Sequence, residues 1–306
     1  MSVHMDVLRG KAVVITGSGR GIGAACARSV ARLGAAVVVN DVNADSANQV
    51  AGEIKSAGGR AVAHVANIAS WSEARGLVDR CVSEFGAIDG LVNNAALFMM
   101  GTLEEMAEAD CKRLFDVNVI GTANCAAHAV KHMKKAGRGS IINVTSGAHM
   151  GIPAMGVYGA TKGAVASFTY TWAMELKDSG IRVNALSPQA DTAMGASTGE
   201  YYASHGMQKP DRQQPPADNN TPVVEYLLSD ASSGITGQVV RIDGRQLALC
   251  AHPGVLMPLL TSERWTCESV AAAFEKDLAK RQLPLGIMGM KVETMPNPSA
   301  FWAGTK

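Results

Sequence analysis

Net charge, aromatic residues and long apolar runs are all scarce in this chain of 306 residues. It carries 28 lysines and arginines against 27 aspartates and glutamates, for a formal net charge of +1. The charges are scattered, so the sequence gives no electrostatic reason to expect nucleic acid or an anionic membrane surface as a partner. No segment reaches the roughly 18 consecutive apolar residues of a transmembrane helix. The N-terminus also lacks the apolar core of a signal peptide, so we expect a cytoplasmic protein.

The six cysteines and seven histidines show no recognised metal-binding pattern. The cysteines stand far apart and form no CxxC pair, so we expect buried thiols rather than disulfides or zinc ligands. His128 and His132 are the nearest histidine pair, four positions apart, but no acidic residue or cysteine accompanies them. We therefore expect no metal site.

Seven short apolar segments alternate with segments of helical character. They cover residues 11–16, 36–40, 61–66, 88–96, 140–144, 181–187 and 237–244. Short runs of this kind suit strands that are buried on both faces. Their alternation with helices predicts an α/β fold, in which helices cover both faces of a parallel sheet and ligands bind at the carboxyl ends of the strands. With 47% hydrophobic residues, the chain is long enough to form one large core as a soluble protein.

A glycine cluster follows the first of these segments, in TGSGRGIG, and a helix ending at Gly34 follows the cluster. Gly17, Gly21 and Gly23 would allow a tight turn and a close approach of the backbone to a ligand. The helix N-terminus behind them would offer N–H groups and the positive end of the helix dipole to a pyrophosphate. By itself the cluster is a common feature of strand-to-helix turns.

Asp41 ends the second apolar segment, 18 residues after Gly23. An acidic residue at about this distance grips a ribose hydroxyl in dinucleotide-binding folds. Its charge would repel a 2′-phosphate, so the sequence favours NAD over NADP. Arg20 in the glycine turn is the residue that could reverse this preference. Asp41 could instead cap the following helix, a role that Asn43 or Asp45 could fill equally well.

Three further places on the chain carry candidate polar groups. Asn67 and Ile68 follow the third apolar segment, and Asn94 and Ala95 end the fourth, where each taken singly is an ordinary loop residue. Asn118 lies within a long predicted helix, residues 103–135. Burial of an amide there is costly without partners, so it either faces solvent or belongs to a hydrogen-bonded network.

Tyr158 and Lys162 stand four residues apart in YGATK, at the start of a predicted helix. They would share one face of that helix, so the ammonium would lie close to the phenol and lower its pKa. Such a phenol could act as an acid or a base near neutral pH. Ser146 lies just past the end of the fifth apolar segment. YxxxK alone is most often an ordinary helix start, and the other motifs raise its significance.

The assembled motifs resemble the short-chain dehydrogenase/reductase family over about residues 9–246. TGSGRGIG resembles the family's TGxxxGxG, NNAA its NNAG and YGATK its YxxxK, while DASSGITGQVVRIDG resembles its final strand. The resemblance implies a Rossmann-type, doubly wound, seven-stranded parallel sheet in a single domain, residues 1–249. It also implies a homo-oligomer, either a tetramer or a dimer. Residues 250–306 would be a C-terminal extension that packs on its own domain or on a neighbouring subunit.

The same resemblance implies hydride exchange between a nicotinamide cofactor and a carbonyl compound or secondary alcohol. Tyr158 would be the acid/base, Lys162 would hold the nicotinamide ribose and Ser146 would hydrogen-bond the substrate oxygen. Asn118 would support a water relay to Lys162. Besides Tyr158 and Lys162, the residues implied to contact the cofactor are Gly17, Ser18, Gly19, Arg20, Gly21, Ile22, Gly23, Asp41, Asn67, Ile68, Asn94, Ala95 and Thr192.

The loops expected around the pocket are rich in methionine, which suits a bulky hydrophobic ketone or alcohol. These residues are Phe98, Met99, Met100, His149, Met150, Met155, Met194, Tyr201, Tyr202 and Met207, and each could equally line the core. Residues 195–218, with little predicted regular structure, would form a lid or a disordered insert. The leading hypothesis is an NAD-dependent alcohol dehydrogenase/ketone reductase. The alternatives are oxidation of a dihydrodiol, an NADP-dependent 3-oxoacyl or hydroxysteroid reductase, and a non-catalytic cofactor-sensing protein.

Overall fold

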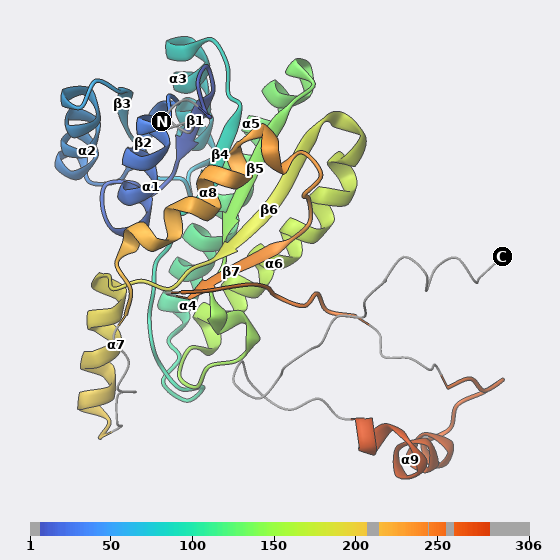
Figure 1. The fold of residues 1–306 in the computed structure, drawn as a ribbon. Coiled ribbons are helices and arrows are strands. Elements are labelled where there is room, and N and C mark those ends of the chain that lie inside the picture. The colour runs from blue at the N-terminus through green and yellow to red at the C-terminus, as the bar shows by residue number, and fades with distance from the viewer. Residues whose placement is uncertain (1–6, 207–213, 244, 255–259, 282–306) are drawn as a thin grey trace. The chain divides into compact units, whose positions relative to one another are not determined.

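A computed structural model describes residues 7–206, 214–243, 245–254 and 260–281 (Figure 1). Its contacts divide the chain into two units, Met1–Cys250 and Ala251–Lys306. The second unit contains helix α9, Cys267–Lys276, whose start is capped by reciprocal hydrogen bonds between Thr266 and Ser269. Among the described residues, no helix is both long enough and apolar enough to cross a membrane.

The first unit is built on one sheet of eight strands in the order β3-β2-β1-β4-β5-β6-β7-β8. Strands β1 to β7 run parallel, as the apolar segments predict, and β8 pairs antiparallel with β7. The bounds are β1 Ala12–Ile15, β2 Ala36–Asp41, β3 Arg60–Val65, β4 Gly90–Asn93, β5 Gly139–Val144, β6 Ile181–Ser187, β7 Val239–Asp243 and β8 Gln246–Leu249. The doubly wound α/β fold is thus confirmed. The additional strand β8 was not expected.

Helices cover both faces of this sheet (Figure 1). One apolar core lies between the sheet and helices α1, α2 and α8, and a second lies between the sheet and helices α3, α5 and α6. The bounds are α1 Gly21–Arg32, α2 Ala44–Ser56, α3 Trp71–Phe85, α4 Glu108–Phe115, α5 Thr122–Ala136, α6 Gly156–Leu176, α7 Ala193–Ser204 and α8 Thr221–Leu228. The helices therefore hold the strands in place and leave the strand ends to form a site.

Several helix boundaries follow from local sequence. The Asn43 side chain accepts the N–H of Ser46 at the start of α2, and Ser70 accepts that of Glu73 at the start of α3. Gly86 ends α3 with a positive φ of 81°, a conformation that glycine adopts without a steric penalty. The cap that the sequence offered as an alternative role for Asp41 is therefore filled by Asn43.

Two expected segments differ in the structure. The predicted helix over residues 103–135 is α4 and α5 joined by a π-helical turn, Asp116–Gly121, and residues 103–107 precede it outside any helix. Part of the segment 195–218, expected to lack regular structure, belongs to α7. Its residues include small and polar types that give α7 no clear apolar face, so periodicity does not reveal it.

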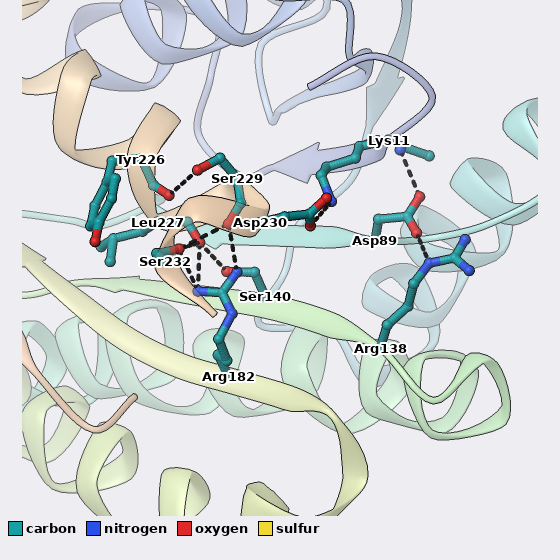
Figure 2. A network of polar contacts seen from close by, with 11 residues as sticks. Lys11, Asp89, Arg138, Ser140, Arg182, Tyr226, Leu227, Ser229, Asp230 and Ser232 are labelled. Carbon is teal, nitrogen blue, oxygen red and sulfur yellow. Dashed lines mark hydrogen bonds and ion pairs between the residues drawn. The ribbon is translucent and has the colours of Figure 1, made fainter. Parts of the chain in front are cut away.

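A polar network connects the elements at the amino ends of the strands, on the side of the sheet away from the carboxyl ends (Figure 2). Arg182 at the start of β6 donates to the carbonyl oxygens of Leu227 (2.9 Å) and Ser229 (3.2 Å) and to the hydroxyl of Ser232 (2.8 Å). Asp89 accepts the backbone N–H of Ala12 (2.9 Å) and pairs with Arg138 (2.8 Å). These contacts join α8 and the starts of β1 and β5 to the sheet, so we assign this edge a role in stability.

We predict that Asp89→Ala destabilises the fold by about 2–3 kcal/mol, because it leaves a buried N–H and a guanidinium without their acceptor. Asp89 is 8% exposed, whereas the Asp230 side chain that pairs with Lys11 is 91% exposed. Asp230→Ala is therefore the matched control and should cost less than about 1 kcal/mol. Urea unfolding of both variants checks this, and equal losses would contradict it.

Candidate active site

The glycine turn between β1 and α1 is packed too closely for side chains. A Cβ on Gly23 would lie 2.4 Å from the Gly17 oxygen and 2.5 Å from Asn94 Nδ2, and a Cβ on Gly17 would lie 2.7 Å from Ala95 Cα. Gly17 and Gly21 also have positive φ values of 59° and 55°. The turn therefore brings bare backbone to the start of α1, as the sequence predicts.

The N-terminus of α1 is suited to an anion. Arg20 occupies the cap position without a side-chain hydrogen bond to the helix, and the first turn contains no acidic residue. Ser18 faces inward, where its hydroxyl donates to the Ile15 carbonyl oxygen over 2.7 Å. Gly19, Gly21 and Ile22 complete the turn. The first N–H groups of the helix and its positive dipole end thus fit the pyrophosphate of a dinucleotide.

Asp41 lies beside this turn at the end of β2. Its two carboxylate oxygens accept the backbone N–H groups of Gly19 and Asn43, each over 3.1 Å. Each oxygen retains a second lone pair that could accept a ribose hydroxyl. The side chain is therefore held in place by the backbone, and its negative charge faces the region where the adenosine end of a dinucleotide would lie.

Asn94 and Ala95 support the glycine turn from β4. Asn94 Nδ2 donates to the carbonyl oxygens of Thr16 and Gly17, both over 2.9 Å. The Thr16 hydroxyl in turn accepts the backbone N–H groups of Asn94 and Ala95, both over 3.0 Å. Thr16 is a supporting residue that the sequence analysis missed, because its partners come from a distant strand. Asn94 thus shapes the cofactor site through the turn.

Asn67 and Ile68, at the end of β3, have mainly structural contacts. Asn67 Oδ1 accepts the N–H of Ala69 over 3.1 Å, and its own N–H binds Glu73. Ile68 is 3% exposed and packs in the second apolar core, against Gly121. The Ile68 side chain faces away from solvent, so the predicted contact with an adenine ring would fall to the backbone and to the exposed Asn67.

Ser146, Tyr158 and Lys162 are brought together by β5 and α6. Lys162 Nζ is buried and donates to the carbonyl oxygen of Val144, the last residue of β5, over 2.8 Å. The same Nζ lies 5.8 Å from the centre of the Tyr158 ring. Tyr158 is 7% exposed and its hydroxyl interacts with the Ser146 side chain. The three side chains therefore form one polar group at the carboxyl edge of the sheet.

The electrostatics of this group differ from the expectation. Burial raises the pKa of Tyr158 to about 12, while its hydrogen bond with Ser146 acts in the opposite direction. Burial also lowers the pKa of Lys162 to about 8. The expected lowering of the Tyr158 pKa by Lys162 is therefore wrong for this structure. Lys162 is directed at the Val144 carbonyl, and loss of water around each group is the largest influence on its pKa.

Asn118 lies in the π-helical turn and is fully buried. Its side-chain oxygen accepts the Leu97 N–H over 2.7 Å, and its nitrogen donates to the Leu97 carbonyl (2.9 Å) and the Thr161 hydroxyl (3.0 Å). It belongs to a hydrogen-bonded network, which was one of the two alternatives. The network links the loop after β4 to the helix that carries Tyr158. Its role in a water relay to Lys162 stays a prediction.

Thr192 precedes α7 and lies across from the glycine turn, where its Cγ2 is 3.6 Å from the Cβ position of Gly21. Gln189, in the same loop, exchanges hydrogen bonds with Asn220, with the Gln189 N–H donating over 3.3 Å and the Asn220 nitrogen donating over 3.0 Å. Asn220 is fully buried. This loop is therefore anchored close to the predicted cofactor site.

An apolar cluster surrounds Tyr158. The ring of Phe98 meets that of Tyr158 edge to face at 4.9 Å, and Met99 and Met155 pack in the same cluster. His149 contacts the Ser146 carbonyl oxygen through Nδ1, and Met150 packs against another cluster around Val239. Met207 lies outside the described residues. In the described part of the chain, no three His, Cys, Asp or Glu side chains gather as metal ligands.

Comparison with known proteins identifies relatives over most of the chain. The model of the short chain dehydrogenase family matches residues 11–202. An uncharacterised oxidoreductase of Methylorubrum extorquens is 38% identical over 247 residues, which are 78% of this chain and 99% of that protein. A cis-4-hydroxycyclohexanecarboxylate dehydrogenase of Sinomonas cyclohexanicum is 36% identical over 244 residues, 78% of this chain and 97% of that protein.

Solved structures of similar proteins also superpose on most of this chain. A short chain dehydrogenase from Mycobacterium avium superposes with a TM-score of 0.79 at 30% identity, covering 92% of this chain and 98% of its own. A gluconate 5-dehydrogenase from Burkholderia cenocepacia, in complex with NADP and tartrate, gives 0.70 at 32% identity over 79% and 96%. An NAD⁺-bound xylitol dehydrogenase gives 0.74 at 30% identity over 78% and 99%.

We predict that Gly23→Ala abolishes measurable NAD binding in calorimetric titration, because the new Cβ would displace backbone at the turn. Gly52→Ala is the matched control: nothing lies within 4 Å of its Cβ position in α2. That variant should bind as the wild type does and gain up to about 1 kcal/mol of stability. Equal NAD affinity in the two variants would exclude the turn from the nucleotide site.

Proposed function

The chain belongs to the short chain dehydrogenase family of oxidoreductases, and we propose that it exchanges a hydride between NAD(H) and a secondary alcohol or ketone. The observation that carries the proposal is the convergence of Ser146, Tyr158 and Lys162 at the carboxyl edge of the sheet. The glycine turn and Asp41 lie at the ends of the neighbouring strands β1 and β2. A nucleotide site and an acid/base group therefore share one edge of the sheet.

The residues divide the chemistry between them. When bound, a nicotinamide supplies or accepts the hydride. Tyr158 would give a proton to the substrate oxygen during ketone reduction and take it back during alcohol oxidation, and Ser146 would hydrogen-bond the same oxygen. Lys162 would hold the nicotinamide ribose from its position at the end of β5. Asn118 would keep the loop after β4 against α6, so that the two sides of the site stay in register.

The pKa of Tyr158 supports its role as a proton donor. At about 12, the phenol is protonated at neutral pH and can donate as negative charge develops on the carbonyl oxygen. Lys162, with a pKa of about 8, changes charge close to neutral pH and lies next to the ring. The protonated form of Lys162 would favour ionisation of the Tyr158 phenol. Alcohol oxidation requires that ionised phenol as the base.

We infer NAD as the preferred cofactor, because the Asp41 carboxylate would repel the 2′-phosphate of NADP. Related structures carry either cofactor, NADP in the gluconate 5-dehydrogenase and NAD⁺ in the xylitol dehydrogenase. The preference for NAD therefore rests on Asp41 of this chain. The apolar cluster of Phe98, Met99 and Met155 beside Tyr158 favours a hydrophobic substrate. The cyclohexane ring of the compound named for the Sinomonas cyclohexanicum relative could pack on such a surface, whereas its carboxylate would need a polar partner.

A non-catalytic cofactor sensor is the alternative from another class. Such a protein would not need an acid, a second hydrogen-bond donor and a buried amine around one point, yet all three are present. NADP-dependent reduction of a 3-oxoacyl or hydroxysteroid substrate remains the alternative within enzymes. A panel of ketones and alcohols, assayed with both cofactors, separates these functions.

We predict that Tyr158→Phe lowers kcat by about 10²–10⁴-fold, because the proton donor is lost while the ring remains. NAD affinity should be nearly unchanged, since the ring of residue 158 and all the other residues implied to contact the cofactor are retained. Steady-state kinetics and calorimetric titration of NAD provide the two readouts. Tyr226→Phe, which alters a 47% exposed tyrosine on α8, is the control and should keep full activity. Substantial activity in Tyr158→Phe would refute its assigned role.

We predict that Asp41→Ala shifts the ratio of kcat/KM for NADP over NAD upward by about tenfold or more, because like-charge juxtaposition costs several kcal/mol. Asp41→Asn is the informative companion. It removes the charge but keeps an oxygen that can accept the Gly19 N–H, and so separates charge from support of the turn. A wild type that already prefers NADP would overturn the cofactor assignment.

A further inference from the structure

Glu105 connects the loop after β4 to the end of α7. Its Oε2 accepts the Tyr201 hydroxyl over 2.6 Å, and its Oε1 lies 2.7 Å from His205 Nε2. The rings of Tyr201 and His205 stack at 4.0 Å with an interplanar angle of 21°. About a hundred residues of chain separate Glu105 from its partners, so these contacts are purely tertiary.

Glu105 is itself held by its own loop. Oε2 also accepts the backbone N–H of Thr102 (2.7 Å) and the Thr102 hydroxyl (3.0 Å). The adjacent Gly101 donates its N–H to the Ala154 carbonyl oxygen over 2.8 Å and forms a β-bridge with Met155. Met155 is the cap residue of α6, three positions before Tyr158. The carboxylate is thus fixed to the segment that starts the Tyr158 helix.

The other end of the α7 segment is anchored separately. Asp191 donates its N–H to the Pro215 carbonyl oxygen over 2.8 Å, and Gln189 exchanges hydrogen bonds with Asn220. Helix α7 is therefore held at its start by contacts near the predicted cofactor site and at its end by Glu105. Helix α7 bridges the loops that follow β4 and β6. Both loops begin at carboxyl ends of strands, where the candidate active site lies.

Both ring nitrogens of His205 face oxygen acceptors. Nδ1 lies 2.9 Å from the Tyr201 carbonyl oxygen and 3.0 Å from the Ser204 hydroxyl, while Nε2 faces the Glu105 carboxylate. A neutral imidazole has one N–H, whereas neither the carbonyl nor the carboxylate can donate. The doubly protonated ring satisfies both contacts. Its hydrogen bonds with the Tyr201 backbone and then with Glu105 raise the pKa of His205.

We propose that Glu105 is a positioning residue that latches α7 across the Tyr158 site, and that the latch loosens when His205 loses its second proton. The part of the proposal that concerns catalysis rests on the proposed dehydrogenase function. Glu105, Tyr201 and His205 are the three groups of the latch. Its closure would fix the wall of the substrate pocket and so set the apparent affinity for the alcohol or ketone.

The pH dependence follows from the charges. Hydrogen bonds from Tyr201, Thr102 and His205 lower the pKa of Glu105 to about 2, so the carboxylate stays ionised in the working range. Glu104, in the same loop, adds further negative charge near Tyr201. The hydrogen bond with Glu105 raises the pKa of Tyr201, which keeps its hydroxyl protonated. The His205 arm is complete below the raised His205 pKa and weakens as pH rises through it.

Hydrogen exchange of the full chain tests the latch without reference to activity. Amide exchange in residues 193–206 is compared at about pH 6 and about pH 9, after correction for intrinsic exchange rates, because these values bracket histidine titration. In wild type, protection should fall several-fold at the higher pH. Glu105→Gln should lose protection at both values, and His205→Gln should lose the pH dependence.

Matched controls are available on the same chain. Glu104→Gln changes the adjacent exposed glutamate, and His132→Gln changes a histidine that faces Asp79 on α3. Both should show wild-type exchange in residues 193–206. Equal protection in the Glu105 and Glu104 variants would overturn the latch. A wild-type pH response in His205→Gln would overturn the role of its proton.

Kinetics with cyclohexanol as the probe then test the positioning role. Glu105→Gln should raise KM for cyclohexanol several-fold and leave KM for NAD unchanged. An unchanged KM for cyclohexanol, despite faster exchange in α7, would overturn positioning. If wild type turns over no alcohol or ketone, the proposed function fails, whereas the exchange results still decide the latch.

Discussion

A buried hydrogen bond from Lys162 Nζ to the carbonyl oxygen of Val144 holds the candidate active site together. It fixes the second turn of α6 to the last residue of β5, and Ser146 follows β5 by two positions. The phenol of Tyr158 is thereby set beside both groups. Burial of the amine lowers the pKa of Lys162, and burial of the phenol raises the pKa of Tyr158. The same burial that builds the site therefore sets the proton chemistry that it offers.

The two edges of the sheet have separate tasks. Where the strands begin, Arg182 donates to oxygens of neighbouring elements, and Asp89 accepts the Ala12 N–H and pairs with Arg138 (Figure 2). Where they end lie the glycine turn, Asp41 and the group of Ser146, Tyr158 and Lys162, which we propose as the site for cofactor and substrate. Because parallel strands place all carboxyl ends on one edge, residues scattered from Gly17 to Thr192 can meet there. Stabilising contacts thus gather at the amino ends of the strands, and the proposed chemistry at their carboxyl ends.

Sequence alone predicts those parts of the molecule that depend on local pattern. The seven parallel strands, the glycine turn and the position of Asp41 follow from short apolar runs and from spacing. What depends on tertiary contacts does not follow. Asn118 bonds to Leu97 and Thr161, which lie 21 and 43 positions away in the sequence. The raised pKa of Tyr158 results from burial, which no sequence motif reveals. The α7 helix and its contact with Glu105 are also missed, because polar, small residues carry little periodic signal.

The π-helical turn Asp116–Gly121 limits how the length of this region can change during evolution. A π turn holds one residue more than an α turn between hydrogen-bonded groups. Deleting the extra residue would restore ordinary α geometry, whereas a deletion in the flanking turns of α4 or α5 would rotate everything beyond it by about 100° around the axis. Asn118 and the buried face of α5 could then no longer point at their present partners together. Insertions and deletions should accordingly be excluded from the helices that flank this turn among relatives that keep the amide, while nearby surface loops remain free to vary.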